Sequence, residues 1–99
     1  MGLDCLLEDE FGEELGSVED ADGLLAKAWP AGDASYPYLR RVDLEGTTQF
    51  NRLQLADVMP ELERLSEAAP EARPRLRAIL QLARKALAEP HLHLRFLGD

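Results

Sequence analysis

Two histidines close to the end of the chain are the residues whose type and spacing indicate chemistry most directly. His91 and His93 lie two positions apart in a segment that alternates polar and apolar residues. On a β-strand this spacing projects both imidazoles from one face, as in many metal sites carried by strands. Candidates for further ligands are Asp43, Glu45 or an acidic residue of the N-terminal segment. Arg95 continues the same face and would repel a cation, so a solvated polar strand face is the competing interpretation.

A second candidate site is the polar stretch 43–54. Its hydrogen-bonding side chains crowd a predicted turn and helix entrance, where such side chains satisfy free backbone groups. The alternative is a small pocket in which Arg52 and free N–H groups bind an anion. No glycine-rich phosphate loop accompanies the stretch, which disfavours nucleotide binding. The residues assigned to this combined binding site are Thr47, Asn51, Arg52, Gln54, His91, His93 and Arg95.

The net charge of −8 is unevenly distributed. Residues 1–35 carry ten acidic residues against Lys27 alone, which gives −9, whereas residues 36–99 carry nine acidic and ten basic residues, which gives +1. This asymmetry disfavours nucleic acid and predicts attraction to a basic protein partner, although solubility is the simpler interpretation. Aromatic residues near position 30 either close a core or anchor an interface. The residues assigned to this interaction are Glu8, Asp9, Glu10, Glu13, Glu14, Trp29, Tyr36 and Tyr38.

Cysteine content and hydropathy narrow the class of protein further. Cys5 is the only cysteine, so the chain has no intramolecular disulfide and no cysteine-based zinc site, which suits a reducing compartment. No window approaches the roughly 18 consecutive apolar residues of a membrane span. No serine-hydrolase or zinc-protease motif is present. We therefore expect a cytoplasmic protein that needs no cofactor, and the balance favours a function without catalysis.

The elements that must position these residues are organised around a helical hairpin, residues 55–89. Apolar residues recur twice at helical spacing, on either side of a proline-marked break at 67–74. The short break predicts antiparallel neighbours. Asn51 and Asp57 are both candidate caps of the first helix, and Pro60 favours Asp57 because proline would then occupy the first turn. The second helix should begin near Pro74 and end by Glu89.

Strands are predicted at residues 2–8, 38–44, 47–50 and 91–97. The middle two would form a hairpin through Glu45 and Gly46, since glycine can adopt the positive φ of a tight turn. A further strand at 14–18 beside the first has less support. Ser17 begins a capping-box pattern that predicts a short helix over residues 18–28. The predicted fold is one α+β domain, with a small mostly antiparallel sheet of three to five strands packed on the antiparallel helix pair.

Three segments of the chain resemble small bacterial proteins of no known activity. The segments are Arg41–Gln54, Pro60–Leu65 and Phe96–Asp99, and the resemblance covers residues 38–99. It implies a compact bacterial domain in which the 43–54 stretch and the Gly98–Asp99 end belong to one site. It supplies no activity.

Two functional hypotheses from different classes follow. The first is an acidic cytoplasmic binding or regulatory module, for example an immunity-type inhibitor that covers a basic partner surface. The alternative is a small metal- or anion-binding protein or enzyme that uses His91, His93 and the 43–54 turn. A homodimer formed through an exposed sheet edge is a third arrangement.

Overall fold

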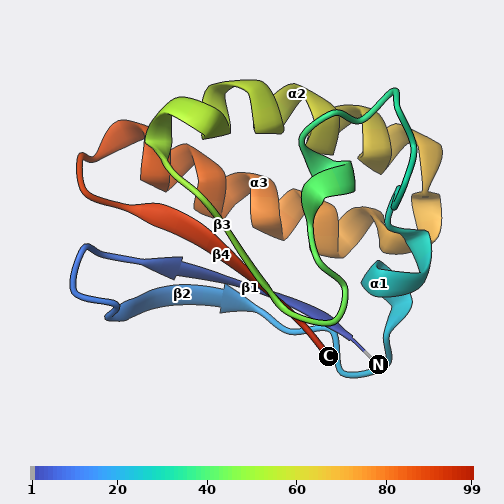
Figure 1. The fold of residues 1–99 in the computed structure, drawn as a ribbon, viewed down its shortest axis with the longest axis horizontal. Helices are drawn as coiled ribbons and strands as arrows, with labels where there is room; N and C mark the ends of the chain where they lie inside the picture. Colours follow the sequence, from blue (N-terminus) through green and yellow to red (C-terminus); the bar gives the residue numbers. More distant parts are fainter. Residues whose placement is uncertain (1) are drawn as a thin grey trace.

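The computed structural model describes residues 2–99 and shows a four-stranded antiparallel sheet with two long helices on one face (Figure 1). The strands lie in the order β2-β1-β4-β3, so β1 and β4 are central and the other two form the edges. This architecture confirms the predicted α+β class. The strand bounds are β1 Leu3–Glu8, β2 Glu14–Val18, β3 Thr47–Phe50 and β4 His93–Gly98.

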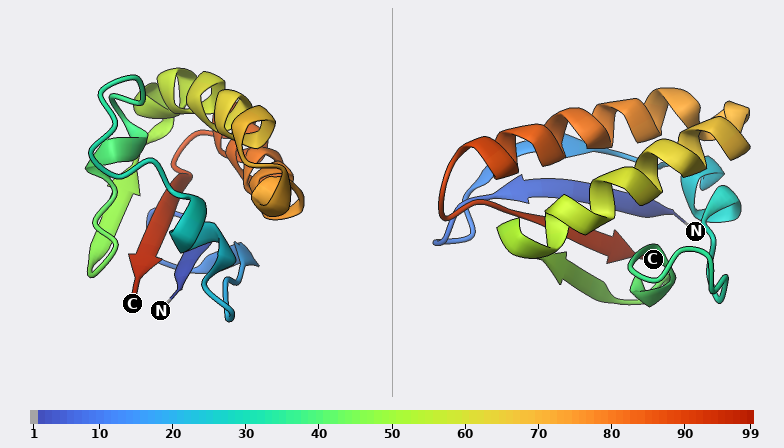
Figure 2. Two further views of the ribbon diagram at one scale, coloured as in Figure 1. Left: turned by 90° about the vertical axis from the view of Figure 1, so that its right-hand side faces the viewer. Right: turned by 90° about the horizontal axis from the view of Figure 1, so that it is seen from above.

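The helical hairpin consists of α2 (Arg52–Ala68) and α3 (Arg73–Ala88), joined by the short 3-10 helix η2 (Pro70–Ala72). Seen from above, both helices run across the strands on the same side of the sheet (Figure 2). Most apolar positions of the predicted repeats are buried between the helices and the sheet. The second helix begins and ends as predicted. The fully buried members are Leu55, Val58, Leu62, Leu76, Ile79 and Ala83.

The first long helix begins earlier than predicted, because Asn51 and not Asp57 is its N-cap. The Asn51 side chain accepts the Gln54 backbone N–H at 2.9 Å, and the Gln54 side chain accepts the Asn51 N–H at 2.9 Å. This reciprocal capping box satisfies two free backbone donors. Pro60 therefore lies inside the helix. It leaves the Ala56 carbonyl without its usual helical donor, and both residues are exposed, so water can reach that carbonyl.

The strand predicted over residues 38–44 is wrong. This segment forms the 3-10 helix η1 (Leu39–Arg41), and β3 pairs with β4 instead of with a preceding strand. The cause is Glu61, a buried residue of α2 whose carboxylate accepts the backbone N–H groups of Tyr38 and Leu39 at 2.9–3.1 Å. Because these donors are already bonded to a side chain, they are not available to a strand ladder.

The N-terminal third also differs in detail from its prediction. The strand at 14–18 is present and pairs with β1, so Ser17 and Val18 belong to a ladder and not to a helix. The helix α1 is limited to Leu24–Ala28, because Gly23 before it has φ 73°, outside the helical region. Asp20 lies three residues after Ser17, at the position that a capping box would require. It is buried instead and its carboxylate accepts the N–H groups of Leu3, Leu25 and Ala26.

The hydrophobic core lies between the sheet and the helix pair. Phe96 of β4 is fully buried at its centre and contacts the rings of Trp29 and Phe50, with centroid distances of 5.3 and 5.9 Å. The Trp29 indole donates to the Leu39 carbonyl at 2.8 Å, which ties the 3-10 helix to this cluster. None of the helices in residues 2–99 has the length and apolarity needed to cross a membrane.

Candidate functional site

The sheet face opposite the helices carries a group of charged side chains in contact with one another. Along β1, Leu3, Cys5 and Leu7 face the core, so Glu8 projects from the other face. Glu8 lies directly across from His93 in the β1–β4 ladder. Its two oxygens contact His93 Nε2 at 3.0 Å and Arg95 Nη1 at 3.3 Å. We call these three residues the Glu8 cluster.

Because Glu8 is buried and held by two partners, the Glu8 cluster can position the backbone at the end of β1. The Glu8 side chain is only 6% exposed, and a carboxylate removed from water to this degree requires charged or hydrogen-bonding partners. Arg95 supplies the permanent positive charge, while His93 adds a hydrogen bond and a charge when protonated. Chemically, the carboxylate–imidazole pair of Glu8 and His93 can exchange a proton, and the Arg95 guanidinium can bind an anion. In this fold the Glu8 cluster fixes the last residue of β1, from which the following turn departs.

His91 does not share a face with His93, so the predicted geometry of a two-histidine metal site is wrong. The strand begins at His93, and His91 lies in the preceding turn with a positive φ of 70°. Its ring Nδ1 lies 3.4 Å from a carboxylate oxygen of Glu10. Within residues 2–99, no three histidine, cysteine or carboxylate side chains converge on a common point.

The turn between β1 and β2 is held by hydrogen bonds of its own. One oxygen of the Asp9 carboxylate accepts the backbone N–H groups of Phe11 and Glu13, both at 2.9 Å. The Asp9 N–H donates to the Glu13 carbonyl at 3.1 Å, and the Gly12 N–H donates to the Asp9 carbonyl at 3.0 Å. Gly12 adopts φ 81°, which glycine tolerates without strain. These bonds fix the backbone of residues 9–13, which we call the acidic turn.

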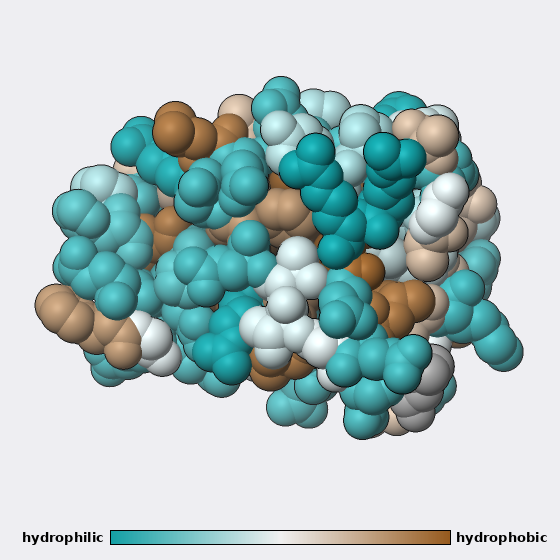
Figure 3. Space-filling model, viewed as in Figure 1, coloured by the Kyte–Doolittle hydropathy of each residue, from teal (hydrophilic) through white to brown (hydrophobic). Residues whose placement is uncertain are grey.

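The acidic turn presents an exposed aromatic side chain among carboxylates. Phe11 is 87% exposed, and Glu10, Glu13 and Glu14 around it are exposed as well. Figure 3 shows a hydrophobic spot surrounded by hydrophilic side chains at the left-hand end of the molecule, where this turn lies in Figure 1. Leu53 is exposed to a similar degree, at 84%, but Phe11 is an aromatic side chain on a backbone fixed by hydrogen bonds, the kind of residue that anchors interfaces.

The other predicted binding residues are mostly occupied by structural contacts. Asn51 and Gln54 cap α2, as described above, and the Arg52 Nε donates to the Leu87 carbonyl at the end of α3, at 3.1 Å. Thr47 is exposed on the edge strand β3, across from Leu97. The structure therefore does not gather these residues and the histidines into one pocket.

The two segments that the bacterial resemblance places in one site do meet, through their backbones. The Gly98 N–H donates to the Gly46 carbonyl at 2.6 Å. A Cβ at position 98 would lie 2.3–2.4 Å from backbone atoms of Asp43 and Leu44, so only glycine fits there. This contact explains a glycine at position 98 by packing alone.

Trp29, Tyr36 and Tyr38 pack on the core side of the molecule, which agrees with the first of the two alternatives, core closure, and not with their assignment as exposed interaction residues. Trp29 and Tyr36 are buried, with 6% and 9% exposure, and Tyr38 is half-buried. Arg64 lies over the Tyr36 ring and Arg41 over the Tyr38 ring, 4.8 and 4.9 Å from the centroids. Glu61 draws this segment onto α2, so its rings cannot act as exposed anchors in this conformation.

Phe11 is the candidate residue that the sequence interpretation missed. It is the only aromatic residue in a stretch of charged and glycine residues, Asp9–Glu14, where no neighbouring apolar residue could share a core with it. That isolation was the available signal.

A scan against protein-family models, a search of curated proteins and a search of solved structures each find no match to this chain.

Proposed function

We propose that this chain is a non-enzymatic protein-binding module whose acidic turn docks a basic partner, with Phe11 inserted into an apolar pocket of that partner. The observation that carries the proposal is the 87% exposure of Phe11 on a backbone fixed by the Asp9 carboxylate. Interfaces concentrate their binding energy in a few anchors of this kind, and aromatic side chains are enriched among interface residues.

Pre-organisation supports this assignment. Binding costs free energy when a loop must be ordered, and a turn that is already fixed avoids that cost. The acidic turn is fixed internally by Asp9 and at its base by Glu8, which His93 and Arg95 hold. The Glu8 cluster thus contributes to binding by positioning the turn.

Charge supplies selectivity for a basic surface. Three exposed carboxylates surround Phe11, and the remainder of residues 1–35 adds further negative charge. Such a field raises the association rate with a basic partner and repels acidic competitors. A regulator that covers a basic functional surface, of the immunity-type inhibitor class, is the role we propose. We place it in the cytoplasm, because its single thiol is unpaired and unpaired thiols persist in reducing compartments.

The test identifies the partner through the turn itself. A photo-crosslinking amino acid is placed at position 11 in cells, and the crosslinked protein is identified by mass spectrometry. The purified partner is then titrated with wild-type protein, with Phe11→Ser and with E10Q/E13Q/E14Q. We expect Phe11→Ser to weaken binding about 30-fold, as for an interface hot spot. The triple variant should slow association and flatten its salt dependence.

A matched variant separates local from overall charge. E19Q/E45Q/E71Q neutralises three other exposed acidic residues, so both triple variants have a net charge of −8 + 3 = −5. The matched variant should associate with the partner at nearly the wild-type rate. Binding of Phe11→Ser with wild-type affinity, or an association rate that salt does not change, would overturn the proposal.

A further inference from the structure

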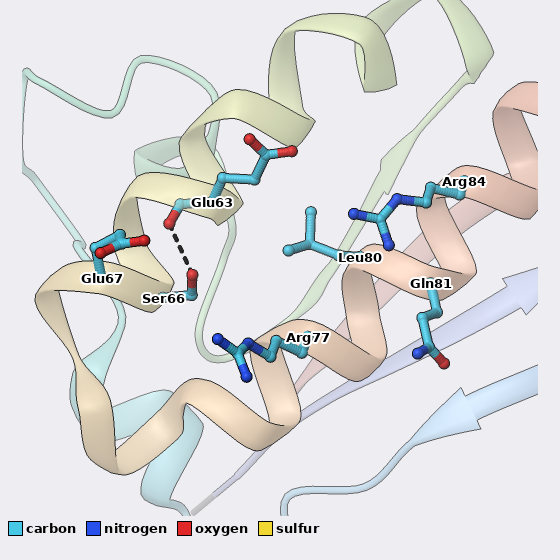
Figure 4. Close-up of a pocket in the computed structure, with 7 residues that line it drawn as sticks. All are labelled: Glu63, Ser66, Glu67, Arg77, Leu80, Gln81 and Arg84. Atoms are coloured by element: carbon cyan, nitrogen blue, oxygen red, sulfur yellow. Dashed lines mark hydrogen bonds between the residues drawn. The ribbon is translucent and has the colours of Figure 1, made fainter.

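The outer surface of the helix pair contains a groove of about 370 Å³ that has opposite charges on its two walls (Figure 4). Glu63 and Glu67 line it from α2, and Arg77 and Arg84 line it from α3. The two guanidinium groups point toward the space between the helices (Figure 4). Leu80 forms part of the floor. We call these four charged residues the groove charges.

The groove charges are not neutralised within the molecule. All four residues are exposed, and among residues 2–99 none of them forms an ion pair with another charged side chain. Of the five basic residues of α3 (Arg73–Ala88), Arg75 is paired with Asp20 and Asp22 and does not line the groove. The α3 wall of the groove is therefore basic through Arg77 and Arg84, and the α2 wall is acidic through Glu63 and Glu67.

A second copy of the chain is the occupant whose charge pattern fits this surface. A two-fold rotation between facing helix pairs can place the acidic wall of one copy against the basic wall of the other, and each pair of walls then occurs twice. The groove charges sum to zero, with two acidic and two basic residues, while the excess negative charge of the chain lies in residues 1–35. This face is thus a place where two copies of net charge −8 can approach with little local repulsion.

We propose that the chain self-associates into a two-fold dimer through the outer faces of α2 and α3, with Glu63 and Glu67 of each copy paired to Arg77 and Arg84 of the other. The dimer leaves the acidic turn free, because that turn lies at the left-hand end of the sheet, away from the outer faces of the helices (Figure 1). It therefore presents two Phe11 anchors to partners at once.

The size of the face predicts a weak and salt-dependent dimer. Helices of 17 and 16 residues are about 25 Å long, so the face offers roughly 500 Å² for each copy, below the roughly 800 Å² of a standard interface. At about 0.15 M salt the Debye length of about 8 Å screens the distant acidic residues, whereas pairs in contact are screened less. At about 1 M salt the contact pairs are screened too, and the dimer should dissociate.

The experiment is sedimentation velocity of the full chain up to about 1 mM, at about 0.15 M and about 1 M salt, because small interfaces give weak dimers. E63R/E67R alone and R77E/R84E alone should each raise the dimer dissociation constant about tenfold or more. An equimolar mixture of the two variants should recover a dimer of wild-type strength, because each restores the complement of the other. Circular dichroism checks that both variants fold.

Two controls make the outcome decisive. R40E/R41E changes the net charge from −8 to −12, as R77E/R84E does, but lies outside the groove, so the dimer should be retained. Phe11→Ser should also leave the dimer unchanged, which separates this inference from the proposed function. A wild-type monomer at every concentration would overturn the inference. So would a dimer that neither charge reversal affects, as expected for pairing through a sheet edge.

Discussion

Two irregular segments of this molecule use the same hydrogen-bonding arrangement and reach opposite results. In the acidic turn, the Asp9 carboxylate accepts two backbone N–H groups two and four residues ahead of it. In the segment 36–42, the Glu61 carboxylate accepts two N–H groups that lie more than 20 residues before it. The local bond makes a turn that stands alone and exposes its aromatic side chain. The distant bond draws its segment onto α2, where Tyr36 is buried and Tyr38 is half-buried.

This difference shows what separates a displayed aromatic residue from a core one. Phe11 is exposed, because the backbone hydrogen bonds around it come from within its own turn, while Glu8 holds only the base of that turn. Tyr36 is covered, because the segment that carries it is bonded to a helix and Arg64 lies over its ring. Whether the carboxylate that accepts the backbone N–H groups lies within the segment or on a distant helix thus decides which aromatic side chain is exposed to a partner. Each of the first three predictions below changes a residue that belongs to one of these two segments or fixes it, and the last concerns a third segment.

The largest expected contrast is between Tyr36→Ala and Phe11→Ala. Tyr36 is 9% exposed, so truncation should lower the free energy of unfolding by about 3 kcal/mol, through lost burial and a cavity. Phe11 is 87% exposed, so its truncation should change that free energy by less than about 0.5 kcal/mol. Urea unfolding followed by circular dichroism measures both. A loss above about 1 kcal/mol for Phe11→Ala would show that the side chain packs in solution.

The next effect is that of Glu61→Ala. This change leaves the N–H groups of Tyr38 and Leu39 without their acceptor, and Leu39 is fully buried. We expect a loss of about 2 kcal/mol in unfolding free energy. Glu63→Ala, an exposed neighbour on the same helix, is the matched control and should change stability little. Equal stability of the two variants would contradict the role assigned to the Glu61 carboxylate.

A smaller effect is expected for Asp9→Ala, because the acidic turn is exposed and water can replace the lost acceptor. The unfolding free energy should fall by about 1 kcal/mol, while amide hydrogen exchange at Phe11 and Glu13 should accelerate. Asp9→Asn keeps an acceptor oxygen and serves as the control. Unchanged exchange at both amides in the alanine variant would mean that other bonds hold the turn.

The smallest effect concerns a third segment, residues 20–23, which combines a buried carboxylate, Asp20, with an exposed one, Asp22. Hydrogen bonds from Arg75 lower the pKa of Asp22 from 3.8 to about 2. A carboxyl whose pKa is lowered on folding stabilises the fold above its ordinary pKa, and this contribution disappears as pH falls through about 2. An NMR titration of Asp22 should give that low midpoint, and Arg75→Gln should raise it toward 3.8. The same midpoint in both proteins would exclude Arg75 as the cause.

The parts of the fold that the sequence predicted are those specified by local patterns. The two long helices follow from apolar residues at helical spacing, and β4 follows from alternation up to Phe96. The strand predicted at 38–44 failed because Glu61, which bonds this segment, is distant in sequence and belongs to a different element. The start of the first long helix was predicted too late because of Pro60. An interior proline is tolerated here, since both Ala56 and Pro60 are exposed to water.

The candidate site was predicted only in pieces, for the same reason. The acidic character of residues 8–14 was readable from composition. In the sequence, Glu8 is separated from His93 by 85 positions and from Arg95 by 87 positions. No local pattern indicates a contact over such separations. Nor does charge composition distinguish the buried Glu8 from the exposed Glu10, because the distinction depends on which strand lies alongside.

The burial of Cys5 gives the protein a built-in reporter of its own opening. The thiol is fully buried in a central strand, and burial raises its pKa, so alkylating reagents meet neither an accessible nor an ionised sulfur. Labelling must therefore wait until the core between the sheet and the helices opens and exposes the thiol. With one cysteine in the chain, each modified molecule records a single opening event. The rate of thiol labelling in native buffer thus follows the opening of the core, without any engineered probe.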